Sequence, residues 1–116
     1  MKDIIWLGNS LTEVRSFPEA VKDEVGFSLY RVQNGENPPA SRPLKGFKEA
    51  VYEIVSNYDR NTYRAVYVVN LGDDIFVLAA FMKKSVKGRK TQKHIMDLVK
   101  QRLKAAREIA GKEGRK

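Results

Sequence analysis

The sequence predicts an α+β fold, in which helices pack on one face of a small, mainly antiparallel sheet. Three observations predict it. The chain opens with a short β-branched and aromatic segment, helical signals follow, and three strand-like segments with short connections precede a last amphipathic helix. The 116 residues, 42% of them hydrophobic, suffice for one modest core, so a single domain spanning residues 1–116 is expected.

The N-terminal part predicts one strand and two helices. Residues 4–7 are typical of a strand, and a Gly-Asn pair closes it. Two Ser-x-x-Glu sequences, at 10–13 and 16–19, have the spacing of a capping box, so a helix is expected to begin at each. Gly35 is the expected end of the second helix. This helix should face a core with apolar residues at helical spacing, namely Val21, Val25, Leu29 and Val32.

The second half predicts an antiparallel meander. After a loop at 36–46, the expected strands are 51–58, 62–71 and 75–82, joined by turns at 59–61 and 72–73. The third strand is an almost unbroken apolar run and should be covered on both faces. A basic loop at 83–90 leads to a final helix from Thr91 to Gly111, and residues 112–116 are expected to fray.

Positive charge is concentrated in the last third of the chain. Residues 83–116 contain 13 Lys/Arg and 3 Asp/Glu, for a net charge of +10, whereas residues 1–82 contain 9 and 11, for −2. A slightly acidic body with a strongly basic final segment favours a polyanionic partner, above all a nucleic-acid backbone. A segment that only keeps the protein in solution is the alternative.

Composition excludes several classes of site. The chain contains no cysteine, which excludes disulfides and thiolate metal sites. Its single histidine, His94, argues against a His-based metal site or a Ser–His triad. No apolar run approaches the ~20 residues of a membrane span, and the N-terminus lacks the pattern of a secretory signal. We expect a cytoplasmic protein with no metal, no cofactor and no membrane contact.

Cationic side chains are expected to meet at one end of the sheet. Arg64 lies within a strand, and in an antiparallel hairpin it falls opposite the end of the next strand, near Lys83 and Lys84. Neighbouring segments add four more cations, which are Lys45, Lys87, Arg89 and Lys90. Arg64 has two interpretations: an ion pair with Glu53 or Glu49, or a guanidinium that lines a groove and binds phosphate.

The tyrosines of the expected strands and the histidine can likewise have either a functional or a structural role. Tyr52, Tyr63 and Tyr67 lie in expected strands and could stack on nucleic-acid bases. Packing in the core or on the sheet is the commoner use of aromatic strand residues. His94, at the start of the final helix, is expected to be solvated.

Several motifs together resemble a known family. They are Leu44-Lys45-Gly46, Val51-Tyr52-Glu53-Ile54, Thr62-Tyr63-Arg64-Ala65-Val66-Tyr67 and Val77-Leu78-Ala79-Ala80-Phe81-Met82-Lys83-Lys84-Ser85. Upstream, a Ser-Phe-Pro sequence precedes a helix and a Pro-Pro loop follows it. Over about residues 10–106, this pattern resembles the RelE/ParE toxin superfamily, most of all its phage-related HigB-like branch.

The resemblance implies a RelE-like fold and a bacterial type II toxin–antitoxin toxin. Many such toxins are metal-independent endoribonucleases (mRNA interferases) that cut mRNA on the ribosome, and a small antitoxin, often a helix-turn-helix protein, neutralises them. It further implies that Arg64 stabilises the charged phosphorus centre, that Lys83 and Lys84 position or neutralise phosphate, and that Lys45 assists. The expected RNA-binding residues are Lys45, Lys87, Arg89, Lys90 and Tyr52.

Three departures from the family pattern keep two alternatives open. Many relatives carry His at the position of Ala79 and Arg at that of Val55, and this chain has no Tyr after Tyr67. One alternative is a ParE-type toxin that inhibits a protein target such as DNA gyrase without a nuclease site. The other is a relative that only binds an antitoxin or nucleic acid. An Arg64 held by a carboxylate beneath the surface would contradict the nuclease interpretation.

Overall fold

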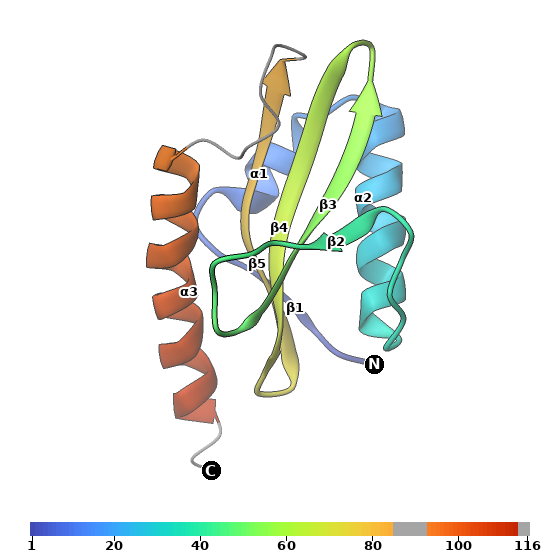
Figure 1. Ribbon diagram of the computed structural model, residues 1–116. Coiled ribbons are helices and arrows are strands. Elements are labelled where there is room, and N and C mark those ends of the chain that lie inside the picture. Colours follow the sequence, from blue (N-terminus) through green and yellow to red (C-terminus); the bar gives the residue numbers. More distant parts are fainter. Residues whose placement is uncertain (85–92, 114–116) are drawn as a thin grey trace.

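The computed structural model describes residues 1–84 and 93–113, without the side chains of Lys84 and Glu113. Its elements follow the chain as β1 (Ile4–Trp6), α1 (Ser10–Arg15), α2 (Glu19–Gln33), β2 (Ser41–Pro43), β3 (Ala50–Tyr58), β4 (Asn61–Leu71), β5 (Asp74–Lys84) and α3 (Lys93–Glu113) (Figure 1). Apart from β2, this order confirms the predicted succession of strand, helix pair, three-stranded meander and final helix.

Five strands of the described chain form one sheet in the order β1-β5-β4-β3-β2. β3, β4 and β5 are the predicted antiparallel meander, and β2 pairs antiparallel with β3. β1 pairs with β5 in parallel, so the sheet is mixed rather than purely antiparallel. β5 therefore lies between two strands, in keeping with its unbroken apolar sequence.

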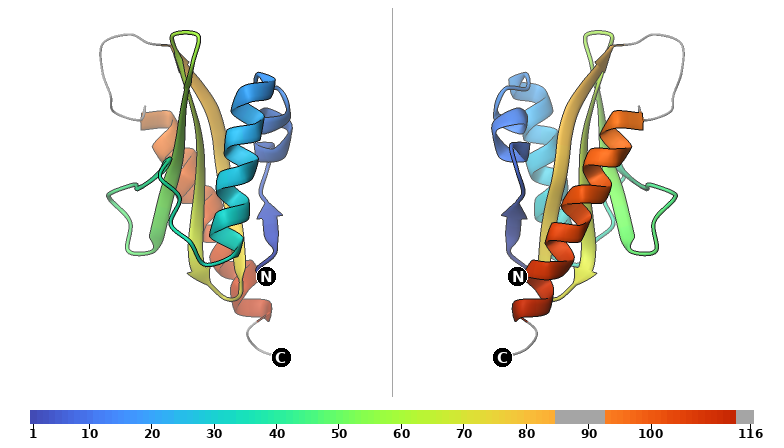
Figure 2. Two further views of the ribbon diagram at one scale, coloured as in Figure 1. Left: turned by 90° about the vertical axis from the view of Figure 1, so that its right-hand side faces the viewer. Right: turned by 90° about the vertical axis from the view of Figure 1, so that its left-hand side faces the viewer.

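Helices cover both faces of the sheet, which corrects the prediction that they share one face. α1 and α2 lie on one side and α3 lies on the other (Figure 2). Tyr67 and Val77 belong to the core under α2, whereas Val66 and Phe76 belong to the core under α3. Because β4 and β5 are apolar at consecutive positions, both of their faces must be removed from water, and one layer of helices cannot do that.

β2 lies where the sequence predicts only a loop. Its three residues pair with residues 52–54 of β3 at the edge of the sheet. Pro43 is tolerated there because an edge strand has one side without ladder partners. Residue propensities do not predict this strand, because prolines at 38, 39 and 43 disfavour strand structure.

The two serines of the expected capping boxes form other bonds instead. Ser10 Oγ donates to the carbonyl oxygen of Val77 at 3.3 Å and so ties α1 to β5. Ser16 Oγ donates to the carbonyl oxygen of Glu13 at 2.6 Å, and Pro18 is the N-cap of α2. Only three residues separate the two helices, so Ser16 closes the first helix instead of opening the second.

The end of α2 matches the prediction and the end of α3 does not. Gly35, at φ 81°, follows α2 and donates its N–H to the carbonyl of Val32 at 3.0 Å, an arrangement that favours glycine. The apolar stripe predicted for α2 is buried, namely Val21, Val25, Leu29 and Val32. α3 continues through Gly111 to Glu113, and its predicted start at Thr91 lies outside the described residues. α3 is the longest helix, and no helix among the described residues is apolar enough to cross a membrane.

Candidate functional site

Arg64 is buried against Glu53 on the face of the sheet that α3 covers. In the β3–β4 ladder Arg64 lies opposite Val55 and Glu53 lies opposite Val66, so the two side chains project from the same face. Arg64 Nη1 donates a hydrogen bond of 2.7 Å to Glu53 Oε1, and the two residues are only 5% and 2% exposed. Of the two interpretations of Arg64, the ion pair is the one observed.

Arg42 of β2 extends this pair to an Arg42–Glu53–Arg64 triad. Arg42 lies opposite Glu53 in the β2–β3 ladder, and its Nε donates to the same Oε1 atom at 2.8 Å. Two guanidinium groups thus share one carboxylate oxygen, and Glu53 Oε2 and Arg64 Nε have no hydrogen-bond partner among the described residues. Sequence analysis misses Arg42 because it misses β2.

The triad fastens β2, β3 and β4 together and does not present Arg64 to a ligand. A buried guanidinium with a compensating carboxylate is held in place, because separating the pair would leave two charges out of water without partners. In this structure Arg64 is a positioning residue for the sheet. The prediction that it lines an open groove and binds phosphate is therefore wrong for this arrangement.

Lys83 and Lys84 lie at the end of β5, as the sequence predicts. They pair with the first residues of β4, beside the β3–β4 turn. Lys83 is half-buried and lies two residues beyond Phe81, which is the ladder partner of Arg64. The side chain of Lys84 lies outside the described residues, as do all of Lys87, Arg89 and Lys90.

Lys45 lies at the other end of the sheet from Lys83. It is exposed in the β2–β3 connection, next to Leu44, whose N–H donates to the carbonyl of Val51 at 2.9 Å. Through the ladders Val51 aligns with Phe76 of β5, seven residues before Lys83. At about 3.3 Å per residue, Lys45 and Lys83 are therefore roughly 23 Å apart along the sheet. The prediction that Lys45 joins the lysine pair is wrong.

Tyr52, Tyr63 and Tyr67 of the meander pack inside the fold, whereas Tyr58 at the end of β3 is exposed. Tyr52 and Tyr67 stack with ring centroids 5.7 Å apart on the α2 side, opposite the face of the triad. Tyr63 packs edge-on against Phe17 at 4.9 Å. The hydroxyl of Tyr67 bonds to that of Ser41, and burial raises the pKa of Tyr67. The packing alternative is thus the one observed, and Tyr52 does not share a face with Lys83.

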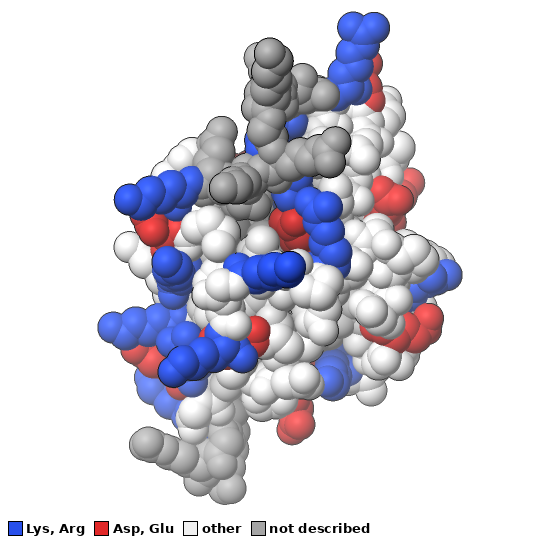
Figure 3. Space-filling view, viewed as in Figure 1, with Lys and Arg blue, Asp and Glu red and all other residues white. Residues whose placement is uncertain are grey.

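A hollow with four cations in its lining lies between α3 and the residues that precede β3. We call it the basic hollow; its volume is about 580 Å³, and its lining residues are Gly46, Phe47, Lys48, Glu49, Lys100, Leu103, Lys104 and Arg107. Figure 3 shows Lys and Arg side chains gathered along the α3 side of the molecule. Sequence analysis misses this site because its two walls are some fifty residues apart in the chain, and only the fold brings them together.

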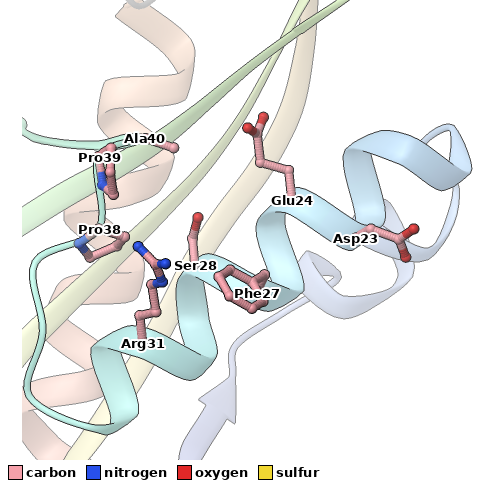
Figure 4. A pocket seen from close by; sticks show the side chains of 8 residues that line it. All are labelled: Asp23, Glu24, Phe27, Ser28, Arg31, Pro38, Pro39 and Ala40. Carbon is pink, nitrogen blue, oxygen red and sulfur yellow. The ribbon is translucent and has the colours of Figure 1, made fainter.

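A second hollow lies between α2 and the Pro38-Pro39 segment (Figure 4). We call it the α2 groove; its volume is about 450 Å³, and its lining residues are Asp23, Glu24, Phe27, Ser28, Arg31, Pro38, Pro39 and Ala40. Phe27 is 58% exposed, and Arg31 Cζ lies 4.7 Å from its ring centroid. Tyr30, one helical turn further on, is 52% exposed.

The fold is that of a RelE-type protein. The crystal structure of the isolated E. coli RelE toxin matches with a TM-score of 0.57 at 20% sequence identity, over 87% of this chain and 98% of that chain. The family model of phage-derived Gp49-like proteins matches residues 12–104. The chain therefore belongs to the Gp49-like family, and the resemblance to the RelE/ParE superfamily is confirmed. Among curated proteins no sequence matches the chain, and its place in the HigB-like branch stays a prediction.

Proposed function

We propose that this chain is the toxin of a type II toxin–antitoxin system and that it inhibits translation by acting on mRNA at the ribosome. The observation that carries the proposal is the fold, which the chain shares with the E. coli RelE toxin. Charge supports it, because the chain has a net charge of +8, and α3, with six Lys/Arg and three Asp/Glu, accounts for +3. The toxin would act in the cytoplasm, where ribosomes and mRNA are found.

The buried Arg64–Glu53 pair contradicts an endoribonuclease in which Arg64 contacts the phosphate. Within this proposal the toxin is therefore a metal-independent endoribonuclease that uses other cations. When the 2′-oxygen of a ribose attacks the adjacent phosphorus, the phosphate gains a second negative charge, which fixed cations stabilise strongly in a site that excludes water. Lys83 and Lys84, at the end of β5, are the residues that would supply the positive charge. Arg64 would act through Glu53, by holding β3 and β4 in place, because its guanidinium is already engaged.

The triad also favours a second candidate, a toxin that inhibits a protein target such as DNA gyrase and cuts no nucleic acid. Arg64 is engaged by Glu53, and the buried Ala79 supplies no titratable group where many relatives carry histidine. A toxin that only binds its target needs a complementary surface and no reactive residue. The engaged Arg64 and the missing histidine therefore do not argue against this candidate.

Induced expression in bacteria separates the two candidates. The endoribonuclease predicts growth arrest, loss of protein synthesis and new mRNA 5′ ends inside codons. Lys83→Ala/Lys84→Ala should lose these ends, whereas Arg15→Ala/Lys22→Ala, the same change of charge on α1 and α2, should retain them. The second candidate predicts arrest with intact mRNA and a DNA-damage response. Growth at the normal rate would contradict both.

The α2 groove is the surface that we propose for the antitoxin. Phe27 and Tyr30 are each more than half exposed, and burying the rest of each ring would contribute about 1–2 kcal/mol. Asp23 and Glu24 disfavour a polyanion here and suit a partner segment that carries Lys or Arg beside an apolar side chain.

Co-purification with the small helix-turn-helix protein expected beside the gene tests this surface. Phe27→Ser/Tyr30→Ser should lose the partner, whereas Lys100→Glu/Lys104→Glu, on the opposite side, should retain it. The reverse pattern would place the antitoxin over the basic hollow and contradict the proposal.

A further inference from the structure

The basic hollow is a concave, positively charged surface, and none of its lining residues is among the predicted site residues. One wall is α3, on which Lys100, Lys104 and Arg107 follow at intervals of four and three residues and therefore share one face. This face extends about 10 Å along the helix axis. The other wall is the connection before β3, which contributes Phe47 and Lys48.

The hollow holds an excess of three positive charges. Lys48, Lys100, Lys104 and Arg107 line it together with a single carboxylate, that of Glu49. Arg107 Nε donates to Glu49 Oε2, and this bond lowers the pKa of Glu49 and raises that of Arg107, so both stay charged. The three lysines form no ion pair with any described residue. Their charge is therefore balanced by mobile counterions, which a polyanion would release on binding.

The helices on the other side of the sheet do not offer a comparable surface. α2 has three carboxylates, Glu19, Asp23 and Glu24, against Lys22 and Arg31. Lys22 pairs with Glu19 at 3.4 Å, and Arg31 lies over an aromatic ring. Charge alone therefore directs a polyanion to the α3 side.

Phe47 adds an aromatic surface at the edge of the hollow. Its side chain is half-buried, so part of the ring remains open next to Lys48. An aromatic ring beside cations is a platform for an unpaired base, worth about 1–3 kcal/mol per base, and the paired bases of a duplex cannot use it. The hollow therefore suits a single strand better than a duplex.

We propose that the basic hollow binds backbone phosphates of single-stranded RNA, with one base stacked on Phe47. This inference rests on the proposed action on mRNA and adds to it a binding surface apart from the end of β5. Lys45, one residue before the lining, extends the same surface. Its expected contact with RNA would thus be made here rather than beside Lys83.

Fluorescence anisotropy with a labelled oligouridylate tests the proposal. Lys100→Glu/Lys104→Glu should weaken binding roughly tenfold or more at about 0.1 M salt, and the log–log salt slope should become shallower by about 0.7 for each phosphate that is no longer neutralised. Arg15→Glu/Lys22→Glu makes the same change of charge on the other face. Because charges further apart than about 10 Å are largely screened at this salt, this control should bind within about twofold of the parent protein.

Glu49→Gln should change the RNA affinity in the opposite direction. It removes the one carboxylate of the hollow and releases Arg107, so binding should tighten, and circular dichroism checks that the variant is folded. Unchanged binding by Lys100→Glu/Lys104→Glu, equal weakening by the control, or tighter binding of a DNA duplex of the same length would overturn the proposal. Translation arrest by the parent protein is scored separately in cells, so failure here is distinguishable from failure of the proposed function.

Discussion

Arg64 Nη1 lies 2.7 Å from Glu53 Oε1, and both side chains lie almost entirely out of contact with water. Both residues belong to the motifs by which the sequence resembles the RelE/ParE superfamily. In this chain they hold each other, with Arg42 as the third member, across β2, β3 and β4. An arginine of a family motif can thus hold the strands of a sheet together without facing a ligand.

Removal of Glu53 is expected to destabilise the fold strongly. Glu53→Ala leaves the buried Arg64 without a counter-charge, and loss of one partner from a buried pair costs about 3–5 kcal/mol. Arg42→Ala is the control, because that side chain is half exposed and its removal should cost about 1 kcal/mol or less. Urea unfolding gives both free energies, and equal losses for the two variants would argue against a structural role of the triad.

Gly8 and Arg102 are expected to be energetically coupled. Gly8 has a φ of 56°, and a Cβ at this position would overlap the guanidinium of Arg102, which donates to the carbonyl of Leu78 at 2.8 Å and to Asn9 Oδ1 at 3.0 Å. Gly8→Ala should cost about 1–2 kcal/mol for the left-handed backbone and about 0.5–1.5 kcal/mol for each displaced hydrogen bond.

A double-mutant cycle measures this coupling. In an Arg102→Ala background, Gly8→Ala should cost only the backbone part, since the obstructing guanidinium and its hydrogen bonds are gone. Costs that simply add would show that a Cβ at position 8 does not displace the guanidinium of Arg102.

The ion pair between Glu49 and Arg107 should be visible in the titration of Glu49. The hydrogen bond from Arg107 holds the pKa of Glu49 below its ordinary value of 4.5. The stability that this pair contributes is therefore present above pH 4.5 and is lost as the pH falls through the lowered value. Arg107→Ala should raise the pKa of Glu49 toward 4.5, as followed by NMR of its carboxyl carbon, and an unchanged value would show that the pair does not persist in solution.

The pKa of Tyr67 should lie above the ordinary value for tyrosine. Burial raises its pKa above 10.0, so the free energy of unfolding is undiminished below pH 10.0 and falls as the pH rises through the higher folded value. Tyr67→Phe removes this loss at alkaline pH, while at neutral pH it costs about 1 kcal/mol through the bond to Ser41. The difference in tyrosinate absorbance between the parent protein and Tyr67→Phe follows the titration of Tyr67, and a pKa at or below 10.0 would refute the prediction.

Local patterns predict most of the elements of this fold. The spacing of Val21, Val25 and Leu29 defines the buried stripe of α2, and the short turns define the meander, because these signals need only neighbouring residues. β2 has no such signal, since Pro43 disfavours a strand and only pairing with β3 creates one. The consecutive apolar residues of β4, at 65–68, were sufficient to predict that helices cover both faces of the sheet.

The site depends on contacts that no local pattern contains. The sequence allows Arg64 either to pair with a carboxylate or to bind phosphate. Only the ladder register and the burial of Arg64 show that it pairs with Glu53. The basic hollow exists because the connection before β3 meets α3, and the lysines of α3 alone do not indicate what faces them. Long-range packing therefore decides which cations are engaged and which remain accessible.

A reconstituted bacterial translation system tests the central claim most directly. Purified protein is added to ribosomes translating a defined mRNA, and both the protein product and the mRNA 5′ ends are followed, with the same mRNA without ribosomes as the control. Our account predicts that synthesis stops and that new 5′ ends appear only where ribosomes are present. Synthesis at an undiminished rate, with the mRNA intact, would contradict it.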